Sequence, residues 1–225
     1  MKHLKNLLFA LPVCAFLMMG CNATRTQKGA VIGGAAGAVG GTIIGKAAGN
    51  KTLGTIIGAV VGGTAGAIIG HDMDKQAEEI KNEIPGAKVE RVGEGIKVEF
   101  NEKILFEFSK SDLGDSAKKN LGSLVDILNK YPNTNIEIQG HTDSRGSDEY
   151  NMGLSVRRAE TVKSFLEGQG IAASRMTTKG FGESAPGYTN DTQEGMAQNR
   201  RVEFIITANE QMKAEAEKQA QQNQQ

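Results

Sequence analysis

The chain has 225 residues, in which 26 lysine and arginine residues balance 26 aspartate and glutamate residues. This balance argues against a nucleic-acid-binding surface, which would give an excess of positive charge. Aromatic residues make up only 5% of the chain and tryptophan is absent, whereas glycine is abundant and clustered. The length suits one or two domains, and the uneven glycine distribution indicates a mosaic of segments.

The N-terminus has the features of a targeting segment. Two lysines precede a short apolar run over residues 7–17, which is too short to span a bilayer and is typical of a signal peptide. The run leads to Gly20 followed by Cys21, and a small residue before cysteine at this place resembles a lipobox. We expect a signal peptide over 1–20, lipid such as palmitate on Cys21, and a spacer over 21–28. The alternative is an ordinary secretory signal with a chance cysteine.

The cysteines and the next residue indicate the compartment. Cys14 lies inside the segment that would be removed, so Cys21 would be the only cysteine of the mature chain and no intrachain disulfide could form. A cysteine that carries more than one acyl chain anchors a protein stably. Cys21 is followed by Asn22 and not by the aspartate that commonly signals inner-membrane retention in Gram-negative lipoproteins. This favours the outer membrane, with the rest of the chain in the periplasm.

Glycines recur at every fourth position through residues 29–70, in two series separated by a short polar turn. The series are Gly29, Gly33, Gly37, Gly41, Gly45 and Gly49, then Gly54, Gly58, Gly62, Gly66 and Gly70. This period places the glycines on one helical stripe, which lets two helices pack closely. The simplest structure is an antiparallel glycine-zipper hairpin. Three interpretations stay open: a hairpin in or against a membrane, a hairpin that forms homo-oligomers in the periplasm, and a flexible spacer.

Two further segments flank the remaining part of the chain. Residues 71–86 are highly charged, with Ile80 and Ile84 one helical turn apart and Pro85 at the end. We expect a short exposed helix that continues the second zipper helix and acts as a linker. Residues 209–225 are rich in Glu, Lys, Ala and Gln, and their scarcity of apolar residues predicts a disordered tail.

Residues 87–208 carry the alternating and helical patterns of a compact domain. The expected elements are a hairpin over 89–100, a helix over 113–128, a strand over 136–140, a helix over 154–168, a strand over 176–181, a long loop over 182–198 and a strand over 202–206. This order predicts an α+β fold, a two-layer βαβαβ-β sandwich with helices on one face of a mixed sheet.

Polar residues gather where the 136–140 strand ends. The chain reads Gly140-His141-Thr142-Asp143-Ser144-Arg145-Gly146, then Tyr150-Asn151, then Leu154-Ser155-Val156-Arg157-Arg158-Ala159, and later Gln198-Asn199-Arg200-Arg201-Val202-Glu203. In order and spacing this resembles the OmpA-like domain, shared with the peptidoglycan-associated lipoprotein and the flagellar motor stator, over about residues 96–207. The layout of lipobox, glycine zipper and OmpA-like domain is similar to the outer-membrane lipoproteins of the YiaD type.

The resemblance implies non-covalent binding of the stem peptides of peptidoglycan. In the family, the Asp of the first stretch and the Arg of the Leu-Ser-x-x-Arg-Ala stretch hold the free end of diaminopimelate. These residues are Asp143 and Arg158 in this chain. The free end is a zwitterion, so a carboxylate matches its ammonium and a guanidinium matches its carboxylate. On this view Arg158 lies one turn into the 154–168 helix, whose N-terminal N–H groups add donors for an anion.

The resemblance extends the site to further positions. They are Asn151, Thr142, Leu154, Arg145, Phe108 and Ser109. Ser109 replaces the commoner aspartate in a wall of the pocket, and Arg145 matches a ligand-contacting arginine in some relatives only. Of the other cations, Arg157 is expected in solvent. Arg200 and Arg201 alternate across a strand, so only one of them can face the site, and we expect both to be structural. A purely structural role, with Asp143 bracing the loop and Arg158 paired to it, is the alternative.

His141 lies beside Thr142 and Asp143 and raises the question of catalysis. The mature chain holds only one other histidine, His71, and no cysteine available as a nucleophile, so no catalytic or metal constellation can be assembled. We expect no enzyme activity, no metal and no cofactor besides the covalent lipid. The leading function is a tether between the outer membrane and peptidoglycan. The alternative is an assembly or chaperone-like factor for outer-membrane proteins that acts through the glycine hairpin.

Overall fold

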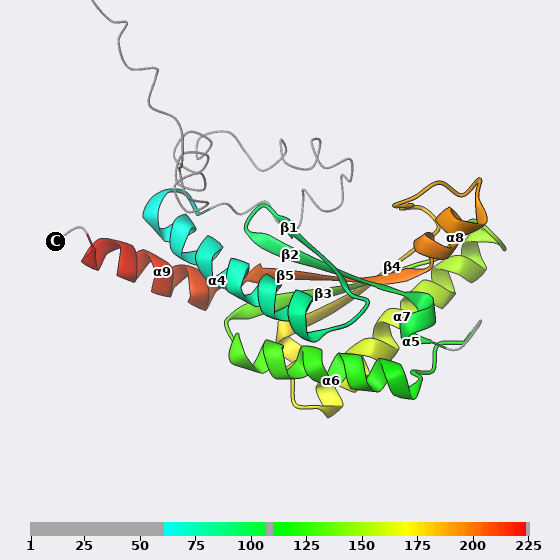
Figure 1. Ribbon diagram of the computed structural model, residues 1–225, viewed down its shortest axis with the longest axis horizontal. Coiled ribbons are helices and arrows are strands. Elements are labelled where there is room, and N and C mark those ends of the chain that lie inside the picture. The colour runs from blue at the N-terminus through cyan, green and yellow to red at the C-terminus, as the bar shows by residue number, and fades with distance from the viewer. Residues whose placement is uncertain (1–60, 107–109, 224–225) are drawn as a thin grey trace, which may run out of the picture.

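The computed structural model describes residues 61–106 and 110–223, which form one mixed sheet covered by helices (Figure 1). In chain order the elements are α4 (Gly63–Glu83), β1 (Lys88–Val92), β2 (Gly95–Asn101), α5 (Glu102–Leu105), α6 (Asp115–Lys130), β3 (Thr134–His141), α7 (Asp148–Gly168), the 3-10 turn η1 (Ala173–Arg175), β4 (Met176–Gly182), α8 (Gln193–Asn199), β5 (Arg201–Ala208) and α9 (Glu210–Gln222).

The five strands are ordered β1-β2-β5-β3-β4. The last strand of the chain lies in the middle of the sheet, antiparallel to both β2 and β3, while β3 and β4 run parallel. This confirms the predicted α+β sandwich with a mixed sheet. The insertion of β5 also brings the C-terminal end of the 182–200 segment next to β2, which no local sequence pattern indicates.

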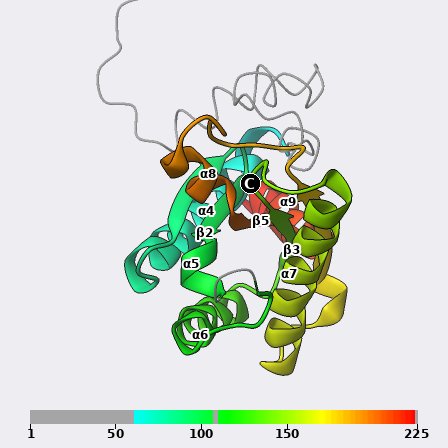
Figure 2. The same ribbon diagram turned by 90° about the vertical axis from the view of Figure 1, so that its right-hand side faces the viewer.

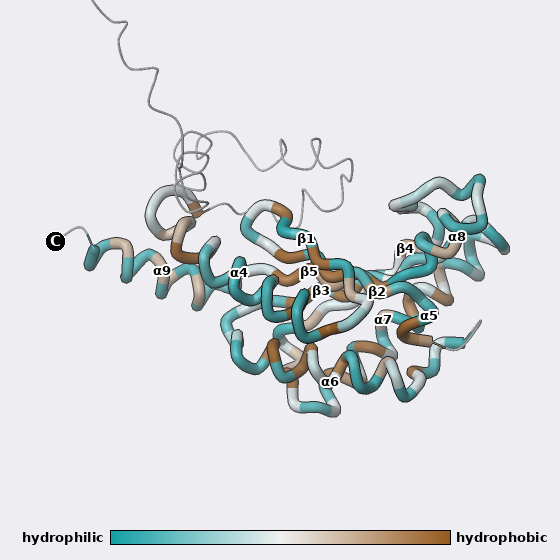
Figure 3. The backbone as a smooth tube through the Cα atoms, viewed as in Figure 1, coloured by the Kyte–Doolittle hydropathy of each residue, from teal (hydrophilic) through white to brown (hydrophobic). Residues whose placement is uncertain are grey.

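Alternation along the strands separates an apolar face of the sheet from a polar one. Phe100 of β2 lies opposite Val202 of β5, and Val98 lies opposite Phe204, so these side chains enter the core together. The rings of Phe100 and Phe204 meet edge to face at 5.6 Å. Apolar residues run through the central strands, whereas the helices alternate between hydrophilic and apolar residues along their length (Figure 3). In the turned view α6 and α7 lie on the same side of the sheet, as expected (Figure 2).

The 71–86 segment is helical, as predicted, but it is not an exposed linker. It belongs to α4, which begins at Gly63 and therefore continues from the end of the glycine series. Met73 and Ile80 are fully buried in the same core cluster as the strands, and Glu79 accepts hydrogen bonds from Lys130 and Tyr131 at the end of α6. The charged residues cover the outer side of a helix whose other side completes the core.

The tail prediction was wrong, because most of the 209–225 segment forms the helix α9. Asn209 caps it by accepting a hydrogen bond from Met212 N at 2.9 Å. Met212, Ala216 and Ala220 recur every four residues and are buried, and α9 packs along α4 (Figure 1). A stripe this narrow is weak by itself, and it becomes a stable contact only against the matching apolar side of α4.

Several expectations fall outside the described residues. They are the signal peptide over 1–20, the lipid on Cys21, the spacer over 21–28, most of the 29–70 hairpin, and the wall at Phe108 and Ser109. Within residues 61–106 and 110–223, no helix combines the length and the apolar character that crossing a bilayer requires.

Candidate functional site

The candidate site lies where β3 and β4 end against α7. Gly140 of β3 is paired with Gly180 of β4. A Cβ atom at Gly140 would lie 2.0 Å from the Ser155 carbonyl oxygen, and one at Gly180 would lie 2.5 Å from Val156. These two glycines therefore let α7 approach the sheet closely. Ser155 Oγ accepts a hydrogen bond from Gly182 N at 2.9 Å and fixes the helix at this point.

The helix α7 begins earlier than expected, and this changes the site. Ser147 caps it by accepting a hydrogen bond from Tyr150 N, and Asp148 and Glu149 occupy its first turn, where acidic side chains suit the helix dipole. Arg158 therefore lies ten residues after the start, about 15 Å along the axis. The expectation that Arg158 lies one turn into the helix, beside free N-terminal N–H donors, was wrong.

Nine residues line a cavity of about 250 Å³ at this place. They are Glu102, Thr142, Asp143, Arg145, Tyr150, Asn151, Leu154, Arg158 and Arg200. Thr142, Asp143, Arg145, Asn151, Leu154 and Arg158 were expected in the site from the sequence. The structure adds Glu102 and Tyr150. It also places Arg200 in the lining, whereas a structural role was expected for both Arg200 and Arg201.

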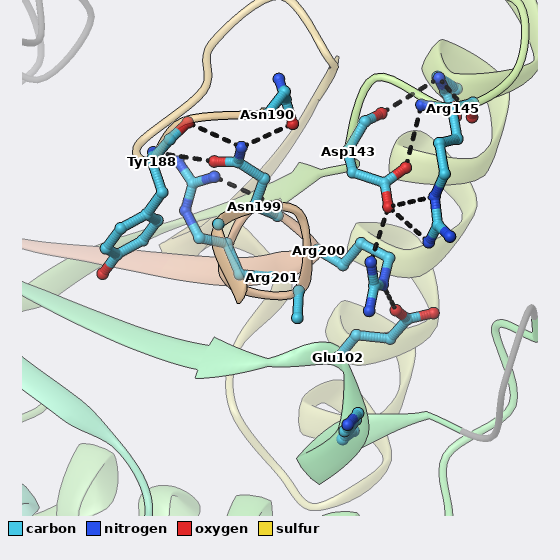
Figure 4. Close-up of polar contacts among 12 residues, drawn as sticks. Glu102, Asp143, Arg145, Tyr188, Asn190, Asn199, Arg200 and Arg201 are labelled. Carbon is cyan, nitrogen blue, oxygen red and sulfur yellow. Dashed lines mark hydrogen bonds and ion pairs between the residues drawn. The ribbon is translucent and has the colours of Figure 1, made fainter. Parts of the chain in front are cut away.

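The charged side chains form one alternating chain, Arg158–Glu102–Arg200–Asp143–Arg145. Arg158 is 1% exposed, forms an ion pair with Glu102 and donates from Nε to the Lys110 carbonyl at 3.2 Å. Glu102 holds Arg200 Nε at 2.5 Å with its other carboxylate oxygen. Arg200 Nη1 in turn lies 2.6 Å from Asp143 Oδ2 (Figure 4). Asp143 and Arg158 thus face one cavity without pairing directly, because Glu102 and Arg200 lie between them.

Asp143 is held as a carboxylate. Burial alone would raise its pKa, but hydrogen bonds from Arg145 and Arg200 outweigh that effect and lower the pKa below the usual value. The loop that carries it is braced by Asn151, whose amide donates to the Asp143 and Arg145 carbonyls and to Glu183. Asn151 therefore shapes the loop. Thr142 is buried, and its hydroxyl has no hydrogen-bond partner among the described residues.

The second arginine of the pair faces the opposite side of the sheet. Arg201 is buried and donates to Glu203 at 2.7 Å, while Arg200 reaches the cavity (Figure 4). This confirms the prediction that only one of them can face the site. Arg157 is exposed, also as predicted.

His141 is not part of the cavity lining. Its ring stacks on Phe181 at 5.1 Å, and neither ring nitrogen has a hydrogen-bond partner in the part of the chain that the structure describes. Burial, reinforced by the positive charge of Arg201, lowers the pKa of His141 to about 3. The imidazole is therefore neutral and packed. Across residues 61–106 and 110–223, no cluster of three His, Cys, Asp or Glu side chains could hold a metal ion.

Glu102 was missed by the sequence analysis, and the chain offers little to find it. It follows β2 and opens the short helix α5, 56 residues before its partner Arg158. Its position next to Arg200 depends on β5 pairing with β2, which also places Glu102 N 2.7 Å from the Arg200 carbonyl oxygen. The one local signal is an acidic residue two positions before an Ile-Leu-Phe run.

Comparison with known proteins agrees with this architecture. Residues 105–200 match the OmpA family, and residues 1–74 match the YMGG-like Gly-zipper family. Probable lipoprotein YiaD of Escherichia coli (strain K12) is 34% identical over 217 residues, which cover 92% of this chain and 99% of that protein. The chain belongs to the YiaD lipoprotein family.

Other relatives share the C-terminal domain alone. Outer membrane porin F of Pseudomonas fluorescens is 44% identical over 117 residues, which cover 52% of this chain and 35% of the porin. A solved structure, the cell wall anchor of the T6SS from Pseudomonas aeruginosa, superposes with a TM-score of 0.53 at 29% identity, over 60% of this chain and 96% of that one. This YiaD-family protein is an outer-membrane lipoprotein whose OmpA-like domain lies in the periplasm.

Proposed function

We propose that this lipoprotein tethers the outer membrane to the cell wall by binding the free end of the peptidoglycan stem peptide, diaminopimelate, in the cavity between Asp143 and Arg158. Lipid on Cys21 holds the other end of the chain in the membrane. The protein acts by binding and performs no chemistry on the wall.

The observation that carries this proposal is the charge of the cavity. Three arginines and two carboxylates line it, which leaves one net positive charge. A zwitterionic ligand end presents an ammonium beside a carboxylate. Asp143 can accept the ammonium, and the guanidinium group of Arg158, which lines the same cavity without pairing with Asp143, can receive the carboxylate.

Similarity to other proteins supports a wall ligand. The cell wall anchor from Pseudomonas aeruginosa has the same fold over most of its length. The motif that carries Asp143 and Arg158 is the one that resembles the peptidoglycan-binding OmpA-like domain, and both side chains line one cavity.

The test is co-sedimentation of the full mature protein with purified sacculi. The variant Asp143→Asn keeps the shape of the side chain and removes the charge that would receive the ammonium. Because a hydrogen bond to a charged group contributes about 1.5–3 kcal/mol, sacculus binding should weaken roughly 10- to 100-fold. Asp126→Asn, an exposed change on α6, is the matched control and should bind like the wild type. Equal binding by folded Asp143→Asn protein would overturn the proposal.

Arg158→Ala is a poor test of the same idea. Arg158 is buried, and its removal would leave Glu102 without one of its two cationic partners. Loss of one member of a buried pair costs about 3–5 kcal/mol, so a failure to bind could reflect unfolding.

A further inference from the structure

Asp143 is fully engaged by the protein's own side chains. Its Oδ2 atom accepts from Arg145 Nε at 2.9 Å and from Arg200 Nη1 at 2.6 Å, and Arg145 Nη2 lies 2.7 Å away. Its Oδ1 atom accepts from the Arg145 backbone N–H at 3.1 Å. Figure 4 shows both guanidinium groups converging on this carboxylate. An ammonium that approaches the Oδ2 atom must therefore displace one of them.

The two arginines are not equally fixed. The Arg200 side chain is 17% exposed and is held at its other side by Glu102. The Arg145 side chain is 53% exposed, and among the described residues it forms ion pairs and hydrogen bonds with Asp143 alone. Exposed ion pairs are weak because water competes for both partners. Arg145 is thus the side chain that can leave at small cost.

We propose that the Arg145 guanidinium is a latch, which occupies the ammonium position on Asp143 in the free protein and swings out when a ligand ammonium binds. The inference rests on the proposed function and refines it. Arg145 competes with the ligand in this chain and does not contact it, in contrast to the role that the family resemblance implied. The latch keeps Asp143 paired when no ligand is bound. Only a ligand whose cation can replace the Arg145 guanidinium on Asp143 then binds.

The loop geometry makes the latch testable without disrupting the pocket. The backbone N–H of Arg145 keeps its bond to Asp143 Oδ1 whatever the side chain is. The Asn151 amide holds the Asp143 and Arg145 carbonyls from the other side. A change confined to the Arg145 side chain therefore leaves the loop braced.

The experiment compares Arg145→Gln with the wild-type full mature chain in detergent, using meso-diaminopimelate as the probe in calorimetric titration. Removal of the competing guanidinium should tighten binding roughly two- to fivefold. This is the change in affinity that corresponds to the free energy of an exposed ion pair. Arg157→Gln removes the same charge from an exposed position on α7 and is the control. It should bind no more tightly than the wild type, because loss of a cation does not favour a ligand carboxylate.

The outcomes separate the two proposals. Weaker binding by Arg145→Gln would mean that Arg145 contacts the ligand, and binding equal to the control would mean that it is inert; either result overturns the latch while diaminopimelate binding stands. Absence of binding by all proteins, including the wild type, overturns the proposed function and the latch with it. A second readout needs no ligand: in carbon-detected NMR, the Asp143 carboxyl of Arg145→Gln should titrate at higher pH than in the wild type, and an unchanged titration contradicts the contact.

Discussion

Glu102 is the acidic side chain that joins two arginines of the cavity, and it explains how these two cations lie so close together. Its two carboxylate oxygens are divided between Arg158 and Arg200. Without a shared carboxylate the two guanidinium groups would repel each other in a place where little water screens them. A buried charge of this kind is tolerated only when it is paired, so each member depends on the others. The candidate site is therefore also a structural unit.

His141 gives a prediction about the dependence of stability on pH. Its pKa is lowered to about 3 by burial and by the charge of Arg201, whereas an unfolded histidine has a pKa of about 6.5. Between these values the unfolded chain binds the proton and the folded chain does not. The stabilising contribution is complete above about pH 6.5 and is lost as the pH falls toward 3. At pH 5 the loss amounts to about 2 kcal/mol.

Urea unfolding at pH 7 and pH 5 checks this contribution. In His141→Phe, which keeps an aromatic ring against Phe181, the fall in unfolding free energy between the two pH values should be about 2 kcal/mol smaller than in the wild type. His71→Gln changes an exposed histidine and serves as the control. If His141→Phe and the wild type lose equal stability between pH 7 and pH 5, the neutral buried imidazole is contradicted.

Some of these residues could be predicted from the sequence and others could not, for a physical reason. Asp143, Arg145 and Asn151 lie within nine positions on one loop and helix start, so a local motif can specify their arrangement. Glu102 and Arg200 are 98 residues apart and meet only because β5 enters the sheet between β2 and β3. Pairings of that kind depend on the whole fold and leave no periodic signal.

At the scale of elements, the same reasoning explains why the strands and α6 were predicted well and the flanking helices were not. The strands alternate strongly, and α6 buries a full apolar side that includes Leu121, Leu124 and Leu128. The buried positions of α9 are one methionine and two alanines. A stripe of this kind is too weakly apolar to distinguish a packed helix from a solvent-exposed segment. Its partner α4 lies at the other end of the described chain, so neither segment indicates the contact alone.

The packing of α9 on α4 predicts that the same substitution has different effects at two alanines of α9. Ala216 is 2% exposed and faces α4, whereas Ala214, two positions earlier, is exposed. Ala216→Asp would place a charge in the contact and should lower the free energy of unfolding by at least about 2 kcal/mol or detach α9. Ala214→Asp should change it by less than about 0.5 kcal/mol.

Urea unfolding and limited proteolysis check this prediction. Detachment of α9 would appear as early cleavage of the C-terminal segment in Ala216→Asp and not in Ala214→Asp. Equal behaviour of the two variants would mean that α9 does not pack on α4 in solution.

At the scale of the whole molecule, the OmpA-like domain begins inside the glycine-rich region and not after it. Ala65 and Ile69, which belong to the second glycine series, are buried in the domain core. Gly63 opens α4 with a positive φ of 74°. The helix α4 therefore carries the end of the second glycine series into the domain core, with α9 packed along it. A boundary at residue 87, as the sequence suggested, would cut this core.

Two deletions distinguish the tether from an assembly factor that acts through the zipper. Removal of residues 29–60 leaves α4 intact, so the mature protein should fold and bind sacculi like the wild type. Removal of residues 29–70 also takes Ala65 and Ile69 from the core, and loss of a buried isoleucine alone costs about 2–5 kcal/mol. Thermal unfolding and sacculus co-sedimentation of both proteins measure the difference. Loss of sacculus binding by a stably folded protein that lacks residues 29–60 would show that the zipper takes part in wall binding. If cells that produce this protein keep wall binding but assemble outer-membrane proteins poorly, the assembly role is favoured.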